Sequence, residues 1–60
     1  MQATEIHDYA RRLFEAHGVD AIAEAAQKAR ALEEQGDNEQ AQTWRSIEAA
    51  LLQMRGPHVS

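Results

Sequence analysis

The sequence predicts an all-α fold, a compact three-helix bundle. Three stretches repeat apolar residues at spacings of three and four, which is the period of an amphipathic helix. A glycine follows each stretch, at residues 18, 36 and 56, and glycine commonly stands just after the end of a helix. These two observations predict helices over residues 5–17, 21–35 and 38–55. The connections between them are short, so consecutive helices must pack as neighbours.

The first predicted helix, over residues 5–17, follows Thr4, whose side chain is expected to cap its amino end. Gly18 comes after its last residue, where a left-handed backbone conformation is least costly for glycine. The residues expected to face the core are Ile6, Ala10, Leu13 and His17, with Tyr9 and Phe14 widening the stripe. The pattern therefore predicts one apolar face and one solvated, charged face.

The second predicted helix, over residues 21–35, is expected to be capped by Asp20 and to end at Gly36. Its expected inner face is mostly alanine and consists of Ile22, Ala25, Ala26, Ala29 and Leu32. Alanine is the best helix former but fills little volume, so neighbouring helices must approach closely at this face. Four pairs of opposite charge one turn apart are expected on the outer faces of these two helices: Asp8–Arg12, Arg11–Glu15, Glu24–Lys28 and Arg30–Glu34.

The third predicted helix, over residues 38–55, begins with an acidic cap at Asp37 and has Gln40 three residues later, a variant of the capping box. Its apolar seam is Ala41, Trp44, Ile47, Leu51 and Met54, with Leu52 on the flank. Gly56 and the proline after it are expected to end the helix. Residues 57–60 would then form a short carboxyl-terminal tail.

The single tryptophan, Trp44, has two interpretations. Tryptophan is enriched among binding hot spots, so it is a candidate for a surface contact. Its inward position in an alanine-rich bundle instead favours a role as the main space filler of the core. We therefore expect it to be largely buried against Leu13 or Phe14 and against Ile22 or Ala26.

Length and composition limit the class of protein. Sixty residues form one domain, over residues 1–60, and so short a chain buries only about 60% of its unfolded surface. The absence of cysteine fits a reducing cytoplasm, and neither a signal peptide nor an apolar stretch of about 20 residues is present. The net charge is −4 and no predicted helix is net basic, which disfavours nucleic acid as a partner. We expect a cytoplasmic protein without membrane contact.

No catalytic arrangement is apparent among the reactive residue types. The hydroxyl side chains and histidines form no nucleophile–base pair, and the carboxylates fall in caps and surface pairs. His7 and His17 are ten residues apart on one predicted helix, about 15 Å, which is too far to share a metal ion. His17 is expected to hydrogen-bond the last carbonyls of its helix. We therefore expect no enzyme activity, no cofactor, no metal and no small-molecule substrate.

The third predicted helix carries a recognisable motif, Trp44-Arg45-x-Ile47-x-x-Ala50-Leu51-x-x-Met54-Arg55-Gly56-Pro57-His58. Upstream of it stand Gly36-Asp37 and Tyr9-Ala10-Arg11-x-Leu13. With these motifs the chain resembles a group of small uncharacterised bacterial proteins of about this length. The resemblance implies a complete small protein rather than a fragment, and it implies no activity and no site residues.

These expectations favour a small non-enzymatic protein–protein interaction module or accessory subunit. The first alternative is a transcriptional or regulatory protein. The second is a metal- or ligand-binding helical bundle, which is disfavoured because the sequence has no Glu-x-x-His pair of the kind that such bundles use. The partner would be another protein or a second copy of this chain, because a homodimer joined through the alanine face would add apolar burial. The candidate interaction surface comprises Tyr9, Ala21, Ala25, Ala29, Leu52, Arg55 and His58.

Overall fold

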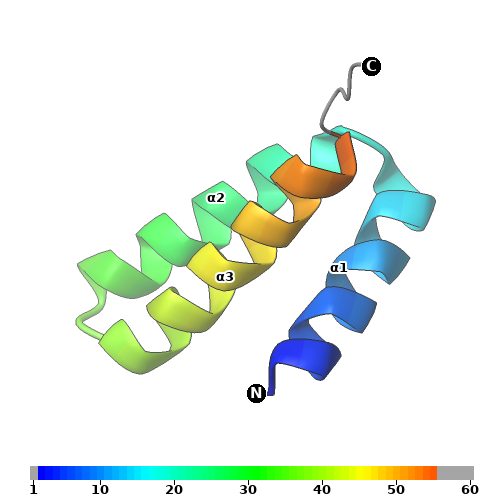
Figure 1. The fold of residues 1–60 in the computed structure, drawn as a ribbon. Coiled ribbons are helices and arrows are strands. Elements are labelled where there is room, and N and C mark those ends of the chain that lie inside the picture. Colours follow the sequence, from blue (N-terminus) through cyan, green and yellow to red (C-terminus); the bar gives the residue numbers. More distant parts are fainter. Residues whose placement is uncertain (1, 56–60) are drawn as a thin grey trace.

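The computed structural model describes residues 2–55 and contains three α-helices in this part of the chain (Figure 1). They are α1 (Ala3–His17), α2 (Asp20–Glu34) and α3 (Asn38–Arg55). The predicted three-helix bundle is confirmed, and each helix begins and ends within two residues of its predicted bounds. The predicted tail, residues 57–60, and the predicted glycine stop at Gly56 lie outside the described residues.

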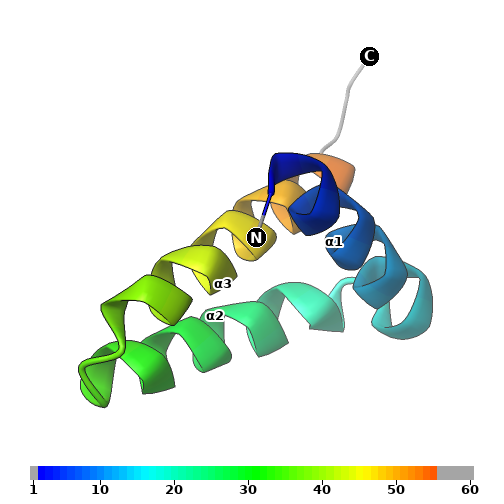
Figure 2. The same ribbon diagram turned by 90° about the horizontal axis from the view of Figure 1, so that it is seen from below.

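The α2 and α3 helices form the central antiparallel hairpin of the bundle, and α1 packs mainly on α3. Figures 1 and 2 show α1 beside the end of the hairpin where α2 begins and α3 finishes. The turn between α2 and α3 projects beyond α1, which gives an elongated shape of 39 × 22 × 20 Å. One part of the hairpin therefore packs against α1, and the part near its turn does not.

The buried core is built mainly from small side chains. Its members are Ala10, Ala21, Ala25, Ala29, Leu32, Ala41, Ile47 and Leu51. Ile47 and Leu51 are the largest fully buried side chains, and half-buried residues such as Ile6, Leu13 and Phe14 pack around them. No aromatic residue of the described chain is among the buried residues. The predicted seam of α3 and the predicted close approach at the alanine face of α2 are thus consistent with the packing.

Of the three predicted helix caps, one is confirmed and two are wrong. Asp37 caps α3, because its Oδ1 accepts a hydrogen bond from the backbone N–H of Gln40 at 3.3 Å. The expected cap of α1 at Thr4 is wrong, since α1 starts at Ala3 with Gln2 at the cap position. The expected cap of α2 at Asp20 is also wrong, because Asp20 is the first helical residue. The connection before it is only two residues long, so the helix begins before an extended cap residue can form.

The turn between α2 and α3 depends on Gly36, which has a positive φ of 82°. Around it the backbone N–H of Asp37 donates to Leu32 O at 2.9 Å, and that of Gly36 donates to Glu33 O at 3.1 Å. These two bonds form a Schellman motif, which ends a helix by using a residue with left-handed backbone. Gly18 also has a positive φ of 63°, but its ψ of −143° places it outside the left-handed helical region.

Candidate interaction surface

Trp44 lies at the edge of the core, which corrects the expectation that it is the main space filler. Its indole is half-buried, and the ring of Tyr9 meets it edge to face with centroids 5.7 Å apart and planes at 80°. The Nζ atom of Lys28 lies 5.8 Å from the Trp44 ring centroid, within cation–π range. Each helix thus contributes one residue to a surface that we call the aromatic junction (Tyr9, Lys28 and Trp44).

The fully buried side chains are small or aliphatic, and the aromatic side chains pack around them. Ala29 and Ala41 are buried, whereas Trp44 is half-buried and packs against the edge of the core cluster. Its ring meets that of Tyr9 on α1, which is 37% exposed. An edge-to-face pair of this kind restricts both rings, and rigid aromatic side chains lose little entropy on binding.

An open depression on α1 adjoins the aromatic junction and shares Tyr9 with it. It is lined by Glu5, Asp8, Tyr9 and Arg12, whose spacings of three and four place them on one side of the helix. Glu5 Oε1 accepts a hydrogen bond from the backbone N–H of Gln2 at 3.1 Å. Within residues 2–55, Asp8 and Arg12 form no ion pair, so the predicted Asp8–Arg12 pair is absent. Asp8 and Arg12 nevertheless line the same depression.

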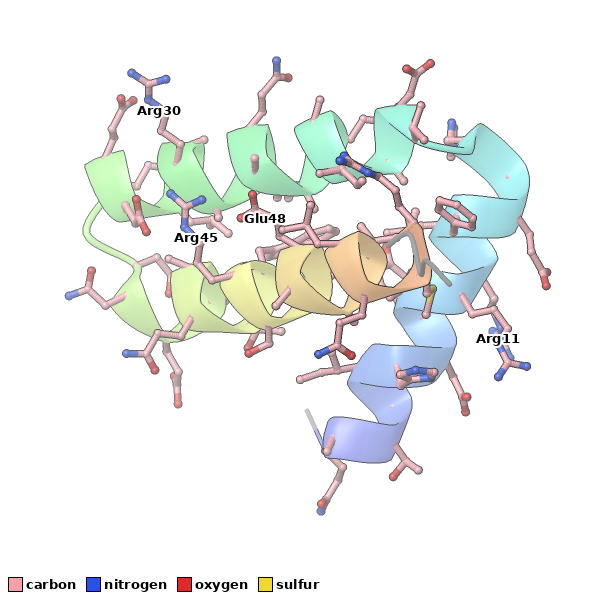
Figure 3. All side chains as sticks on the ribbon, turned by 45° about the horizontal axis from the view of Figure 1, so that its top comes forward. Arg11, Arg30, Arg45 and Glu48 are labelled. Atoms are coloured by element: carbon pink, nitrogen blue, oxygen red, sulfur yellow. The ribbon has the colours of Figure 1, made fainter. Side chains whose placement is uncertain are left out.

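A second polar cluster, which we call the Arg45 clasp (Glu33, Arg45 and Glu48), joins α2 to α3. Arg45 Nε and Nη2 donate to the two carboxylate oxygens of Glu33 at 3.1 and 3.2 Å, and Nη1 donates to Glu48 Oε1 at 3.0 Å. These hydrogen bonds lower the pKa of Glu33 and raise the pKa of Arg45. Figure 3 shows Arg45 and Glu48 lying between the two helices. The clasp connects side chains of α2 and α3 that remain partly exposed and is not part of the aromatic junction.

The other charged pairs differ from those predicted by helix spacing. Within residues 2–55, only Arg30–Glu34 of the four predicted pairs is formed, at 3.9 Å. Glu24 instead lies 3.6 Å from His17 Nδ1, and Lys28 reaches the aromatic junction. His17 is exposed, which corrects its predicted place in the apolar stripe of α1. Glu24 and Lys28 of α2 thus contact residues of other helices and do not pair with each other one turn apart.

The predicted alanine interaction face is wrong. Ala21, Ala25 and Ala29 are each 0% exposed, so none of them can contact a partner in the folded chain. Ala21 and Ala25 belong to the same buried cluster as Ile47 and Leu51. These three small side chains pack between the helices of one chain and are not exposed to a second chain.

The remaining predicted surface residues lie in different places. Tyr9 is part of the aromatic junction, and Leu52 is 43% exposed on α3. Leu52 comes four residues after Glu48, which places it on the clasp side of α3. Arg55 is exposed at the end of α3, and His58 lies outside the described residues. The structure therefore does not unite the predicted set into one surface.

Three other features are absent from residues 2–55. No group of three or more His, Cys, Asp and Glu side chains there could hold a metal ion. Among these residues no buried side-chain nitrogen or oxygen lacks a hydrogen-bond partner. No described helix combines the length and the apolar character needed to cross a membrane. The aromatic junction and its adjoining depression together form the candidate interaction surface.

Four residues of this surface were not predicted as site residues: Glu5, Asp8, Arg12 and Lys28. Lys28 follows Ala21 by seven residues and Ala25 by three, so the helical period places it at the edge of the buried stripe. The position of Lys28 could therefore have been predicted from the sequence. Helical spacing places Glu5 and Asp8 beside Tyr9, but the position of Trp44 next to them depends on how α1 packs on α3.

Comparison with protein-family models, with curated proteins and with solved structures yields no match for this chain. The resemblance of the third-helix motif to small bacterial proteins therefore stays an expectation.

Proposed function

We propose that this protein is a small non-enzymatic interaction module or accessory subunit, acting in the cytoplasm, that binds another protein through the aromatic junction. The observation that supports this is the pairing of Tyr9, which is 37% exposed, with Trp44, which is half-buried at the edge of the core. Tyrosine and tryptophan are enriched among residues that dominate binding energy, especially when they are held rigidly by their neighbours. Tyrosine and tryptophan each combine an apolar ring with one polar group, so they can be exposed to water in the free protein and buried against a partner in a complex.

The charge distribution supports a protein partner over nucleic acid. The net charge is −4, and the cations of α2 and α3 include Lys28 at the aromatic junction and Arg45 in the clasp. Nucleic-acid binding requires basic side chains that gather on one face and displace counterions from phosphates. The engaged cations here contribute to packing within the chain. Neither the regulator hypothesis nor the metal-binding hypothesis gains a specific supporting observation.

The test is affinity capture from the native host with the tagged chain at its natural level. Wild type and two variants, Tyr9→Ala and Leu52→Ala, are compared, because both changes truncate an exposed large side chain on different sides of the bundle. We expect a co-purifying protein that the Tyr9 variant loses and the Leu52 variant keeps. Circular dichroism confirms that both variants are folded. Loss with Leu52→Ala alone would move the binding surface to the clasp side of α3.

Self-association through Tyr9 or Leu52 remains the other form of this proposal. A homodimer that stabilises the fold raises the melting temperature as protein concentration rises. Sedimentation and thermal unfolding across micromolar to millimolar concentrations therefore distinguish a second copy from a different partner. A clean monomer with an unchanging melting temperature would leave only the different partner.

A further inference from the structure

We infer that two copies of this chain exchange α1, with Gly18 as the hinge. In the exchanged form Gly18 adopts helical backbone angles, so that α1 and α2 become one continuous helix over residues 3–34. The displaced α1 then packs on the α2–α3 hairpin of the second copy, in the place of that copy's own α1. Such an exchange requires no other partner, so it goes beyond the proposed function.

A single residue interrupts the helical backbone between α1 and α2. Val19 already has right-handed helical angles, with φ −66° and ψ −18°, and only Gly18, with φ 63° and ψ −143°, departs from them. The N–H of Gly18 donates to Phe14 O at 2.7 Å, and the N–H of Ala21 donates to Gly18 O at 3.1 Å, so hydrogen bonding continues on both sides of the bend. A change in the two dihedral angles of one residue therefore joins the helices. Short, constrained connections of this kind favour exchange between copies.

The connection between α2 and α3 does not have this property. Residues 35–37 all lie outside the two helices, and Asp37 caps α3 through its hydrogen bond to the N–H of Gln40. A continuous helix through this turn would need new backbone angles at more than one residue and would lose the cap. The Arg45 clasp also joins α3 directly to α2. The hairpin therefore stays within one copy, and α1 is the element that can be exchanged.

The surface that α1 covers defines its own occupant. Ala10 is the fully buried residue that α1 contributes to a core cluster whose other buried members come from α2 and α3, Ile47 and Leu51 among them. Removal of α1 would expose part of this apolar cluster to water, which is unfavourable. The segment that fits the vacated place is α1 of another copy, because it carries the same side chains. Closed pairing of two copies satisfies both hairpins at once.

The polar contacts of α1 favour the closed chain only weakly. Among residues 2–55 no ion pair and no side-chain hydrogen bond joins α1 to α3, so apolar packing holds them together. Between α1 and α2, His17 Nδ1 lies 3.6 Å from Glu24 Oε2, and both side chains are 50% exposed. In a continuous helix these two residues would be about 10 Å apart along the axis, and the pair would be lost. So exposed a pair contributes little to stability.

The exchanged dimer keeps the aromatic junction but builds it from two chains. Tyr9 meets Trp44 edge to face with ring centroids 5.7 Å apart, and Lys28 lies over the same indole. Because α1 alone changes copy, the Tyr9 ring of one copy would contact the Trp44 ring of the other. Lys28 and Trp44 would remain in one hairpin. The origin of the Tyr9 ring therefore distinguishes exchange from a dimer of two closed chains.

Two replacements of Gly18 with opposite backbone preferences test the inference. L-Alanine disfavours φ 63° and ψ −143°, and an added Cβ at Gly18 meets nothing within 4 Å, so the preference acts without a clash. Because alanine is also the better helix former and both chains change, Gly18→Ala should lower the dissociation constant of the dimer by about 1000-fold. D-Alanine, introduced at residue 18 by chemical synthesis, favours the observed angles, which mirror polyproline II. It should give a monomer at every concentration.

Gly36→Ala is the matched control. Gly36 also has a positive φ, 82°, and an added Cβ there also meets nothing within 4 Å. Sedimentation equilibrium from micromolar to millimolar concentration should show that this variant self-associates no more than wild type. For Gly18→Ala, labelled and unlabelled chains are unfolded, mixed and refolded together. Isotope-filtered nuclear magnetic resonance should then show a nuclear Overhauser effect between Tyr9 of one copy and Trp44 of the other.

Several results would overturn the inference. These are a monomeric Gly18→Ala protein at millimolar concentration, equal self-association of the two alanine variants, a dimer of the D-alanine protein, or a Tyr9–Trp44 effect that arises only within one chain. Loss of helical circular dichroism in Gly18→Ala would also contradict it, because a helical residue 18 would then be incompatible with the fold. These measurements use no other protein, so capture of a partner through Tyr9 tests the proposed function separately.

Discussion

Replacing Ala25 by leucine should destabilise the bundle, whereas the same change at Ala23 should not. Ala25 is 0% exposed, and Ala23, two residues earlier on α2, is exposed. We expect Ala25→Leu to lower the free energy of unfolding by about 1–3 kcal/mol, the usual cost of overpacking a well-packed core. For Ala23→Leu we expect a change of no more than about 0.5 kcal/mol, as for most surface substitutions.

The magnitude follows from the space around the side chain. Leucine adds three carbon atoms, which would stabilise the fold by about 2.4 kcal/mol if an empty space received them. Ala25 lies in a buried cluster with Ala10, Ala21, Ile47 and Leu51, where the close approach of the helices leaves no such space. The added atoms must push the helices apart. A domain of 60 residues has a stability of roughly 3–9 kcal/mol, so the loss is a large part of the total.

Urea unfolding followed by circular dichroism at the helix band measures both variants. Alanine and leucine have similar helix propensities, so the difference between the two sites reports packing alone. A lower midpoint for Ala25→Leu with an unchanged slope would confirm the expected loss. Equal midpoints, or a higher midpoint for Ala25→Leu, would refute the reasoning that the alanine face is tightly packed.

Three further changes test other parts of the fold. Leu51→Ala removes one of the two largest fully buried side chains and should cost about 2–5 kcal/mol, measured by urea unfolding. Arg45→Ala should lower the melting temperature at neutral pH more than Arg30→Ala, because Arg45 joins two helices. The Arg45–Glu33 hydrogen bonds lower the pKa of Glu33 in the folded state. Their contribution to stability is therefore complete above the ordinary pKa of glutamate and is lost as the pH falls through the lowered pKa. Thermal melts at decreasing pH measure this loss. Gly36→Ala should cost about 1–2 kcal/mol through its positive φ alone, because an added Cβ meets nothing within 4 Å; an unchanged midpoint in urea would contradict this.

The sequence predicts the helices well because their signals are local. The apolar period and the glycines at 18 and 36 depend only on residues within a few turns of one another. Asp37 was correctly predicted as a cap for the same reason, since its hydrogen bond reaches only three residues along the chain. Thr4 and Asp20 were not caps, because an acceptable cap residue does not by itself determine where a helix starts.

The candidate site was predicted less well because it depends on how the helices meet. Glu24 and Lys28 have the preferred order for an ion pair one turn apart, yet each has its partner on another helix. The Arg45–Glu33 hydrogen bonds join residues twelve positions apart, a separation that carries no periodic signal. Such contacts depend on the distance and register between two helices. The residue pattern of one helix carries no information about either.

The alanine core links the fold to the proposed function. If α2 had large inner residues, the hairpin would be wider, and Trp44 could fill the space between the helices. With Ala25 and Ala29 in these positions, apolar burial comes from close backbone approach, and the aromatic side chains are left at the edge. Ala25→Leu and Tyr9→Ala should therefore have different effects. Ala25→Leu should reduce the stability of the fold, whereas Tyr9→Ala should chiefly reduce binding of the proposed partner. The fully buried side chains are thus all aliphatic, and Tyr9 is the aromatic residue left exposed among residues 2–55.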